Sequence, residues 1–402
     1  AFASSLSGQT ITFGSEIIVT DTGGVTVDAT SVGSMTLSGN NTTRLFRVSS
    51  GGVLNLQRLV LTEANGNGTA ADGYGGAMLM NSGTVVTATD CVFTANAATY
   101  GGAIMNYDTS VATGGTLTLR RCTFLGNTAS QRGGAVYSYT PTNGGAIRTH
   151  LDHCTLSGNT ATADHGGGLL NFNGLTTLIH CTVTSNTAPG GKGSGIASYG
   201  DNSTETIVEK SIVAGNTNSD LDFVVAPSTN SFTSAGSNVI GTGNATGDFI
   251  QSRDVTSSTP LLAALADNGG PTQTHALLSG SPALDRATGS ISTADQRGSA
   301  IYGVADSGAF ESGPGGRFRF PDYDPNVPEG SSRDIIIVRE GDIRGAAYVR
   351  LVTTPGTATA ADFTLRPNTS ASDMIFADGE VSKTVTLYTT ADSLVEATQL
   401  FT

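Results

Sequence analysis

The feature that most constrains how this chain can fold is a phrase of about 30 residues that recurs in its first half. Each copy carries a cysteine, an asparagine five residues later and then closely spaced glycines. The copies read "CVFTANAATYGGAIMN", "CTFLGNTASQRGGAVYS", "CTLSGNTATADHGGGLLN" and "CTVTSNTAPGGKGSGIAS", and they begin at Cys91, Cys122, Cys154 and Cys181. A repeat of this length is typical of units that bury their apolar faces only against one another, so the sequence predicts a solenoid.

The residues around each cysteine indicate strands rather than helices. Segments such as "TLTLRRCTF" and "LTTLIHCTV" are short, alternate in polarity and are rich in Thr, Leu and Val, and glycine interrupts every unit. The inward-facing residues are odd-numbered at Leu117 and Leu119 but even-numbered at Cys122 and Phe124. Because alternate residues of one strand face the same side, this switch predicts a two-residue corner at 120–121. Each unit then contains strand, corner, strand, loop and strand, and three strands per turn make a parallel β-helix.

Stacking in register is expected to place like side chains on like. The four cysteines, continued by Ser211, are expected to form a buried column, in which an apolar environment raises the thiol pKa and keeps the thiols reduced and unreactive. A second column is expected at a turn, where Asn side chains can satisfy unpaired backbone groups. Its members are Asn96, Asn127, Asn159, Asn186 and Asn216. Glycine pairs such as Gly101-Gly102 are expected to supply positive φ where the chain re-enters the sheet.

Composition limits the partners that this chain can have. Only 13% of its residues are charged, its net charge is −13 and it has three lysines, whereas nucleic acid requires basic patches. The same balance disfavours docking on anionic lipid, and no apolar run approaches the roughly 20 residues of a membrane span. We interpret the opening "AFASSLSGQT", which has no signal peptide, as a mature or trimmed start.

The pattern C-x-F/L/V-x-x-N-x-A followed by G-G-A/G resembles the right-handed parallel β-helix repeats of bacterial secreted and outer-surface proteins. These include adhesins similar to polymorphic outer membrane proteins. The resemblance covers residues 8–235, where we expect about seven rungs, and it implies both the handedness and an extracellular or cell-surface location. We therefore assign residues 1–236 to an all-β, right-handed parallel β-helix.

Residues 237–314 change character and become rich in Gly, Pro and Asp. The phrases "ADNGGPTQTHAL", "GSPALD", "ADQRG" and "GAFE" resemble the region that closes bacterial β-helices of the choice-of-anchor Q type. We expect this region to cap the solenoid end, whose strand edges would otherwise be unpaired, and to contain one helical turn at "LLAALADNGG". His275, Asp285 and Asp295 are candidates for a catalytic triad, but their spacing does not favour a nucleophile elbow.

Residues 315–402 show five short strands after a Pro- and Gly-rich hinge, which is typical of a sandwich. The segments "PEG", "GTA…DF" and "FADGE" resemble a Calx-beta domain, an immunoglobulin-like sandwich that binds calcium. By position in that family, the candidate calcium ligands are Glu329, Asp362, Asp392 and Glu396, although the acidic run "TTADSLVEATQ" is sparse. The sandwich lacks its last strand, so we expect a trimmed chain or a strand donated by another chain.

A carbohydrate-active enzyme is the main rival interpretation, because pectate lyases and polygalacturonases share the β-helix. Hydrolysis needs two nearby carboxylates, and lyase chemistry needs clustered acids beside a base. Asp152 beside His153 is the best chemical cluster, but a solvated charge ladder also explains it. The corner column brings no two carboxylates together; it consists of Asp90, Arg121, His153, His180 and Lys210.

An ice-binding array is a further alternative, because Thr123, Thr155 and Thr182 are expected to stack outward. The next outward column is irregular, which argues against a flat threonine array. It consists of Thr94, Leu125, Ser157, Thr184 and Ala214.

The sequence thus favours a non-enzymatic, extracellular structural or adhesive protein of a bacterial cell surface or matrix. Its expected partners are further copies of itself, joined head to tail by strand complementation into fibres, and a carbohydrate or other surface ligand. Calcium is the one cofactor that the resemblances suggest. The alternatives left open are a polysaccharide lyase or glycoside hydrolase acting on the β-helix face, and a calcium-dependent ligand-binding adhesin.

Overall fold

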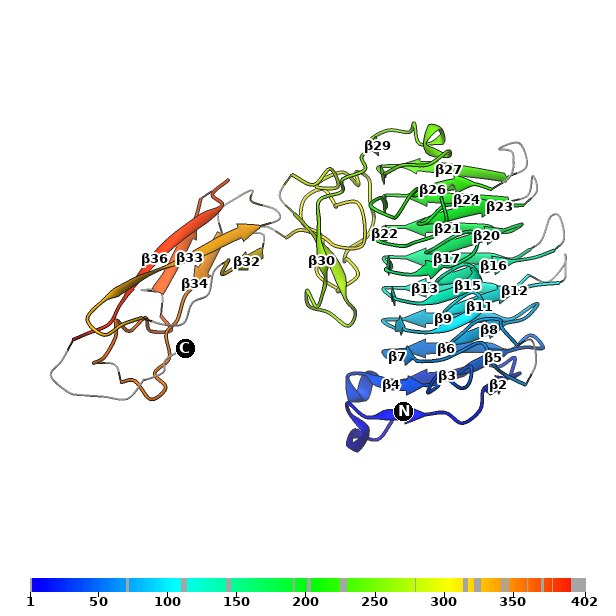
Figure 1. Cartoon of the computed structure of the whole chain (residues 1–402), viewed down its shortest axis with the longest axis horizontal. Coiled ribbons are helices and arrows are strands. Elements are labelled where there is room, and N and C mark those ends of the chain that lie inside the picture. The colour runs from blue at the N-terminus through cyan, green and yellow to red at the C-terminus, as the bar shows by residue number, and fades with distance from the viewer. Residues whose placement is uncertain are drawn as a thin grey trace. The chain divides into compact units, whose positions relative to one another are not determined.

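The computed structural model describes residues 2–69, 72–109, 114–141, 146–190, 192–200, 204–224, 230–278, 280–313, 317–321, 327–340, 343, 347–359, 361–369, 372–377 and 379–391. The chain divides into two compact units, residues 1–277 with 281–311 and residues 278–280 with 312–402. The first unit contains the stacked strands that Figure 1 shows edge-on, and the second contains the strands β32 to β36.

The first unit is a parallel β-solenoid whose described strands form three long sheets. Sheet 1 has ten strands: β1 (Thr10–Thr12), β4 (Met35–Ser38), β7 (Leu59–Thr62), β10 (Val92–Thr94), β14 (Thr123–Leu125), β18 (Thr155–Ser157), β22 (Thr182–Thr184), β25 (Ile212–Val213), β28 (Val239–Ile240) and β29 (Val255–Thr256). Sheet 2 has eight: β2 (Ile17–Val19), β5 (Phe46–Val48), β8 (Met78–Met80), β12 (Ile104–Tyr107), β16 (Val136–Tyr139), β20 (Leu169–Phe172), β23 (Ile196–Tyr199) and β26 (Leu221–Phe223).

Sheet 3 also has eight described strands: β3 (Val25–Asp28), β6 (Val53–Gln57), β9 (Val85–Thr89), β13 (Thr116–Arg120), β17 (Arg148–Asp152), β21 (Leu175–Ile179), β24 (Thr204–Glu209) and β27 (Asn230–Gly236). A short fourth sheet joins β11 (Ala97–Tyr100), β15 (Thr128–Arg132) and β19 (Thr160–Ala161). The only helices among the described residues are single 3-10 turns: η1 (Ser4–Leu6), η2 (Thr30–Val32) and η3 (Thr246–Asp248). The predicted parallel β-helix with three strands per turn is confirmed.

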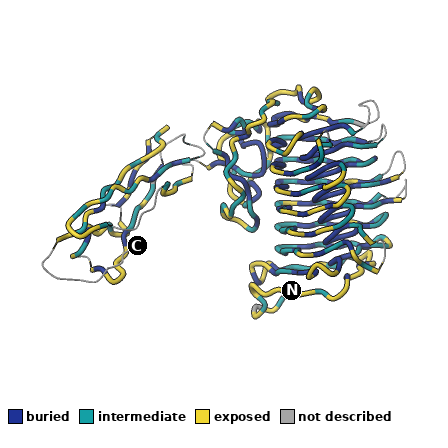
Figure 2. Tube along the Cα trace, viewed as in Figure 1, coloured by how far each residue is buried: buried dark blue, intermediate teal, exposed yellow. Residues whose placement is uncertain are grey.

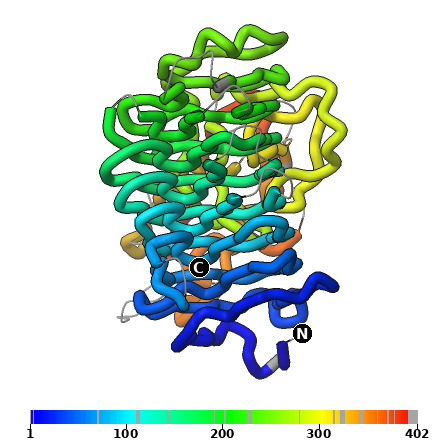
Figure 3. The backbone as a smooth tube through the Cα atoms, turned by 90° about the vertical axis from the view of Figure 1, so that its right-hand side faces the viewer, coloured from blue at the N-terminus to red at the C-terminus, as the bar shows by residue number. Residues whose placement is uncertain are grey.

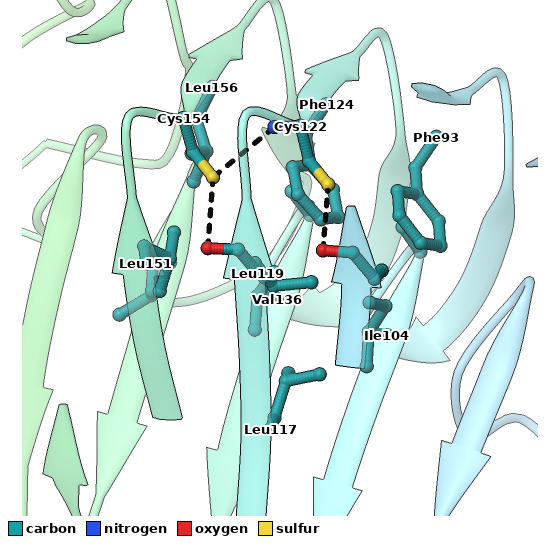
Figure 4. Close-up of a cluster of buried hydrophobic side chains, with 14 of the residues drawn as sticks. Phe93, Ile104, Leu117, Leu119, Cys122, Phe124, Val136, Leu151, Cys154 and Leu156 are labelled. Atoms are coloured by element: carbon teal, nitrogen blue, oxygen red, sulfur yellow. Dashed lines mark hydrogen bonds between the residues drawn. The ribbon is translucent and has the colours of Figure 1, made fainter. Parts of the chain in front are cut away.

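The register of the sheets places like side chains on like, as predicted. In sheet 1, Phe93 pairs with Phe124, and Phe124 pairs with Leu156. The rings of Phe93 and Phe124 stack with centroids 4.6 Å apart and planes 1° apart. Figure 4 shows these rings beside Leu117 and Leu119 from sheet 3, which together form part of the solenoid interior. Along sheet 3, buried residues alternate with partly exposed ones, so one face of each strand forms the core, as the dark interior in Figure 2 also shows.

The corner between sheets 3 and 1 uses a left-handed backbone conformation at residues other than glycine. The second corner residue of successive turns has φ between 48° and 55°: Arg58, Asp90, Arg121, His153, His180 and Lys210. This conformation costs an L-residue about 1–2 kcal/mol, so the parallel pairing on both sides must stabilise each corner. The predicted two-residue corner is therefore present, and the solenoid extends past the predicted end at residue 236, because β28 and β29 also pair in register.

The two glycines of each pair are needed for different reasons. Gly101 has φ of 65°, the left-handed conformation that the sequence predicts. Gly102 does not, but a Cβ atom there would lie 2.1 Å from the carbonyl oxygen of Gly134 in the next turn. The first glycine is thus required by the backbone conformation, and the second is required by the close approach of neighbouring turns.

Residues 257–277 and 281–311, called the flank segment here, pack along the outer face of sheet 1, and this corrects the expected position over the solenoid end. The segment is the yellow-green chain beside the stack in Figures 1 and 3. Its contacts run along the stack from Thr272, whose hydroxyl donates to Arg121 O (3.0 Å), to Ser307, whose hydroxyl donates to Ser237 O (2.5 Å). The predicted helical turn is also wrong, because β30 (Leu262–Ala266) is a strand paired antiparallel with β31 (Thr274–Leu277).

The flank segment covers the threonines that were expected to face solvent. Thr123, Thr155 and Thr182 are buried, and each hydroxyl bonds to the segment. Thr123 donates to Gln273 O (2.6 Å), Thr155 donates to Gln296 Oε1 (2.7 Å), and Thr182 accepts from Ala309 N (3.0 Å). Because an outward hydroxyl column offers donors and acceptors at regular spacing, it suits an irregular chain whose backbone groups need partners.

The second unit contains two small antiparallel sheets. One joins β32 (Arg317–Arg319), β33 (Ser332–Glu340) and β36 (Ser382–Tyr388), and the other joins β34 (Ala347–Arg350) and β35 (Asp373–Phe376). Ile337 from the first sheet and Met374 and Phe376 from the second lie in one buried cluster. The two sheets therefore share a core, as sheets packed face to face do.

Candidate functional site

The four cysteines lie in one buried column inside the solenoid, and all four are free thiols. Figure 4 shows the sulfur of Cys154 facing Leu119 O (3.5 Å), with Cys122 N donating to the same sulfur (3.5 Å). Burial raises the pKa of the Cys91 and Cys154 thiols well above the ordinary value. Ser211 continues the column, because Cys181 N donates to its hydroxyl (2.9 Å). This environment suits packing rather than nucleophilic chemistry.

The asparagine column is a continuous hydrogen-bonded ladder. Asn159 is representative: its Oδ1 accepts from both Asn127 N (3.0 Å) and Asn127 Nδ2 (2.9 Å), and its Nδ2 donates to Phe124 O (3.0 Å) and to Asn186 Oδ1 (2.8 Å). The same contacts recur at the other members, Asn96, Asn127, Asn186 and Asn216. The ladder ends at Asp220, an acceptor that sequence reasoning missed.

The candidate calcium ligands are only partly covered by the described residues. Asp362 is half-buried and accepts a hydrogen bond from Thr359 N (2.6 Å), and Glu329 is exposed. Asp392 and Glu396 lie outside the described residues. Within the part of the chain that the structure describes, no three acidic, histidine or cysteine side chains gather closely enough to hold a metal ion.

The triad considered from the sequence does not form. His275 uses both ring nitrogens elsewhere, with Nδ1 donating to Ala263 O (2.7 Å) and Nε2 accepting from the hydroxyl of Ser157 (2.9 Å). Asp295 pairs with Arg297 at 2.7 Å. His275 thus anchors the flank segment to sheet 1, and the network around Asp295 holds the segment together.

A cleft of about 410 Å³ opens where the flank segment passes the corner column. One wall is formed by Arg121, His150, Asp152, His153 and Ile179 from the solenoid, and the other by residues 291–294 of the flank segment. Its volume lies within the range of small-molecule sites. Sequence reasoning singled out Asp152 and His153, but it did not predict the second wall, because the flank segment was expected at the solenoid end.

Asp152 and His153 form a hydrogen-bonded pair inside this cleft. Nδ1 of His153 lies 2.7 Å from Oδ1 of Asp152. Burial raises the pKa of Asp152, but the hydrogen bond from His153 and nearby positive groups outweigh it, so the net shift is downward and the group is a carboxylate at neutral pH. Because a carboxylate only accepts, Nδ1 carries the proton. Nε2 of His153 is buried and has no hydrogen-bond partner among the described residues.

His180, one turn further along, holds His153 in place. The two imidazole rings stack with centroids 4.7 Å apart and planes 10° apart. Burial and the neighbouring His153 lower the pKa of His180 to about 3, so its ring is neutral. Nε2 of His180 lies 2.8 Å from the hydroxyl of Ser290 in the flank segment. The ring of His153 is therefore packed on one side by a neutral ring that is itself fixed across the cleft.

A second surface feature lies on the outer face of sheet 2. Tyr107, Tyr139, Phe172 and Tyr199, called the aromatic stripe here, occupy equivalent positions in β12, β16, β20 and β23, and all are half-buried. Their ring centroids are 5.6, 4.9 and 4.5 Å apart in that order. The sequence signal was present in "IMNY", "VYSY", "LLNF" and "IASY", where the fourth residue is always aromatic, but sequence reasoning did not use it.

Comparison with known families supports the repeat assignment. Residues 121–139 match the model of the Chlamydia polymorphic membrane protein repeat. These residues run from the corner at Arg121 through β14, β15 and the Gly133-Gly134 pair to the aromatic residue Tyr139, which is most of one turn. Among curated proteins, none matches this chain. The described residues contain no helix whose length and hydrophobicity would allow it to span a membrane.

Proposed function

We propose that this chain is a non-enzymatic structural or adhesive protein exposed on a bacterial cell surface or in its matrix. The observation that carries the proposal is the parallel β-solenoid, in which residues 121–139, part of one turn, match a polymorphic membrane protein repeat. Hydrogen bonds between turns run along the solenoid axis, so the stack resists bending and can project a surface into the medium. An acidic chain with few lysines fits a soluble surface that avoids nucleic acid and anionic lipid.

The aromatic stripe is the surface through which we propose that adhesion occurs, with a carbohydrate as ligand. Aromatic ring faces carry partial negative charge, and the C–H faces of sugars are apolar and weakly positive, so the two stack favourably. Arg132 lies beside the stripe, with its guanidinium 5.5 Å from the ring centroid of Tyr199, and pairs with Asp164 at 2.7 Å. Polar groups of both signs next to a row of rings can bond sugar hydroxyls.

The adhesive role is tested with beads that carry the full chain and are applied to immobilised glycans. Tyr139→Ala is expected to reduce bead retention several-fold, because it removes the ring in the middle of the stripe. Tyr302→Ala is the matched control, since Tyr302 is 60% exposed on the flank segment, away from the stripe. Equal retention of both variants and the wild type would exclude the stripe as the adhesive surface.

The proposal includes an assignment of residues 237–314 to a choice-of-anchor Q-like region and of residues 315–402 to a Calx-beta-like module that binds calcium. Two candidate ligands flank the residues that follow β36: Thr389 Oγ1 donates to Pro328 O (2.6 Å), next to Glu329, and Thr390 N donates to Asp362 O (2.8 Å). Calcium titration calorimetry of the full chain tests this. Asp362→Asn is expected to weaken binding, whereas Asp267→Asn in the flank segment is not; no heat from the wild type excludes the site.

Self-association by strand addition is the finer part of the structural role. At the first turn, β1, β2 and β3 pair on one side only among the described strands, and Ile17 and Ile18 in β2 are exposed. Unpaired edges with apolar side chains favour pairing with another chain. Sedimentation is expected to show concentration-dependent oligomers that Ile18→Lys disperses. A monomer at all concentrations would leave adhesion as the whole function.

The absence of an enzymatic activity is tested directly. Among the residues that the structure describes, Asp152 is the single carboxylate that lines the cleft, whereas hydrolysis of a glycosidic bond needs two. Incubation with neutral and uronic-acid glycans is therefore expected to release neither reducing nor unsaturated ends. Release that Asp152→Asn abolishes would replace this proposal with the enzyme interpretation.

A further inference from the structure

The residue before the left-handed glycine of each turn occupies one equivalent position, and its chemistry changes along the solenoid. In successive turns this residue is Tyr74, Tyr100, Arg132, His165 and Lys192. Backbone hydrogen bonds fix the register, because Gly133 N donates to His165 O (3.0 Å) and Gly166 N donates to Lys192 O (3.0 Å). Arg132, His165 and Lys192, called the basic column here, therefore follow one another along a chain whose net charge is −13.

The basic column borders the aromatic stripe at its Tyr199 end. The Arg132 guanidinium lies 5.5 Å from the ring centroid of Tyr199, and the ring centroid of His165 lies 5.7 Å from it. Nζ of Lys192 lies 3.2 Å from Nε2 of His165. A ligand that covers this end of the stripe therefore also meets the basic column.

The basic column carries more positive charge than its acidic neighbour balances. Asp164 pairs with Nε of Arg132 at 2.7 Å and with Nζ of Lys192 at 3.5 Å, so one carboxylate faces two cations. Burial lowers the pKa of His165, so its ring is neutral at pH 7. The side chains of Arg132 and Lys192 remain 30% and 39% exposed, and together they offer more N–H donors than one carboxylate can accept. The excess positive charge favours an anionic ligand.

Two other sources of negative charge act only weakly at this site. Asp222 contacts the backbone next to Lys192, but it is 2% exposed, and its oxygens accept from Gly193 N (2.8 Å) and Asn244 N (2.8 Å). The net charge of −13 is spread over the whole chain, and physiological salt screens it beyond about 8 Å. An anion paired with the basic column lies within about 3 Å of its partners, so the local cations dominate.

We propose that the ligand of the aromatic stripe is an acidic glycan, whose sugar rings stack on the stripe while its anionic groups pair with Arg132 and Lys192. This inference rests on the proposed adhesive role of the stripe. A neutral glycan gains the stacking but not the ion pairs, and a free anion gains the ion pairs but not the stacking. A chain of charged sugars gains both, so it is expected to bind most tightly.

The test compares immobilised glycans in pairs that differ in charge: polygalacturonate with its methyl ester, and dextran sulfate with dextran. Beads that carry the full chain are expected to be retained several-fold more strongly on the acidic member of at least one pair, and added salt is expected to remove this preference. A chelator in the buffer excludes bridging by calcium. A preference in the first pair identifies carboxylates as the recognised groups, and a preference in the second identifies sulfates.

The inference and the adhesive role of the stripe can fail separately. Equal retention on the acidic and neutral members of both pairs would overturn the inference and leave the stripe as a surface for neutral sugars. No retention on any of the four glycans would overturn the inference as well. The adhesive role of the stripe fails when Tyr139→Ala and the wild type are retained equally on every glycan.

Charge variants make the test specific. Lys192→Gln is expected to reduce retention on the acidic glycan several-fold and to leave retention on the neutral glycan unchanged, whereas Lys192→Arg is expected to keep the wild-type preference. Lys210→Gln is the matched control, because it removes the same charge at the corner between sheets 3 and 1. Asp164→Asn removes the competing carboxylate and is expected to raise retention on the acidic glycan, a gain that loss of folding would not produce. Equal effects of the two lysine-to-glutamine variants would contradict the contact with Lys192.

Discussion

At the scale of single residues, the solenoid depends on side chains that replace missing backbone partners. Each ladder asparagine accepts from a backbone N–H of the preceding turn and donates to a carbonyl in the preceding strand of sheet 1. Asparagine alone offers an acceptor and a donor on one short, rigid group, which is why the sequence could predict this column. The sequence could not predict that Asp220 ends it. An aspartate fits only where no donor is needed, and this depends on the turn that follows, where Thr242 N donates to its second oxygen (2.6 Å).

We expect Asn159→Ala to lower the free energy of unfolding by about 3 kcal/mol or more. The change leaves Asn127 N and Phe124 O without partners inside the protein, and each such group costs about 1–3 kcal/mol. Chemical denaturation measures the effect. Asn55→Ala is the control, because Asn55 lies on the outer face of β6, and it is expected to change stability by less than about 0.5 kcal/mol. Similar losses for both variants would show that the ladder adds no special stability.

The cysteine column leads to a second prediction at this scale. Because burial raises the pKa of Cys91 and Cys154 and all four sulfurs are inaccessible, native protein is expected to react with a thiol reagent only as fast as it unfolds. Denatured protein is expected to show four thiols. Mass spectrometry after alkylation in denaturant counts the labelled thiols. The absence of all four labels would mean that two disulfides covalently join neighbouring turns.

At the scale of elements, the local sequence pattern predicted the strands and the corners, but it did not predict where the flank segment packs. The parity change around Arg120 and Arg121 located the corner because it depends only on neighbouring residues. The cover over sheet 1 depends on residues more than 100 positions away, as in the contact of Ser157 with His275. One local signal existed: Ile212, Val213 and Ala214 are apolar in succession, which is typical of a strand buried on both faces.

Glycine pairs provide the prediction for elements. Gly102→Ala is expected to destabilise the solenoid by about 3 kcal/mol or more, because its Cβ would overlap Gly134 O at 2.1 Å and the turns cannot separate without losing ladder hydrogen bonds. Gly126→Ala is the matched variant: it has φ of 63° but open space around the new methyl group, so only the backbone strain of about 1 kcal/mol applies. Thermal unfolding of the two variants compares them. Equal losses of stability in the two variants would mean that the close contact between turns does not make Gly102 essential.

At the scale of the whole molecule, titrating groups act in opposite directions on stability. Burial lowers the pKa of His165, His180 and His275, so the unfolded chain binds more protons than the folded chain below about pH 6.5. Stability from these groups is therefore lost as the pH falls. Burial raises the pKa of Glu311 to about 7, so the folded chain binds the extra proton between the ordinary carboxyl value and that pH. Stability linked to Glu311 is therefore gained as the pH falls.

We expect Glu311→Gln to make the loss of stability between pH 7 and pH 5 steeper than in the wild type. The variant keeps His165, His180 and His275 but lacks the carboxylate that offsets them, and Glu311 alone accounts for about 3 kcal/mol across its window. Denaturant midpoints at several pH values measure the slopes. Parallel curves would show that Glu311 has the same proton affinity in the folded and unfolded chains.

The flank segment also changes how the molecule should respond to mechanical force. A bare stack of turns can peel open one rung at a time, since each rung holds only its neighbours. Here the chain that leads out of the stack first runs back to the turn of Thr123, which bonds Gln273, and then returns, so that Gln296 bonds Thr155 and Ala309 bonds Thr182. Tension arriving from the C-terminal side must therefore break anchors in three successive turns before it reaches the strand that leaves the stack. The solenoid is therefore expected to resist pulling from this side better than a solenoid whose chain leaves directly from its last turn.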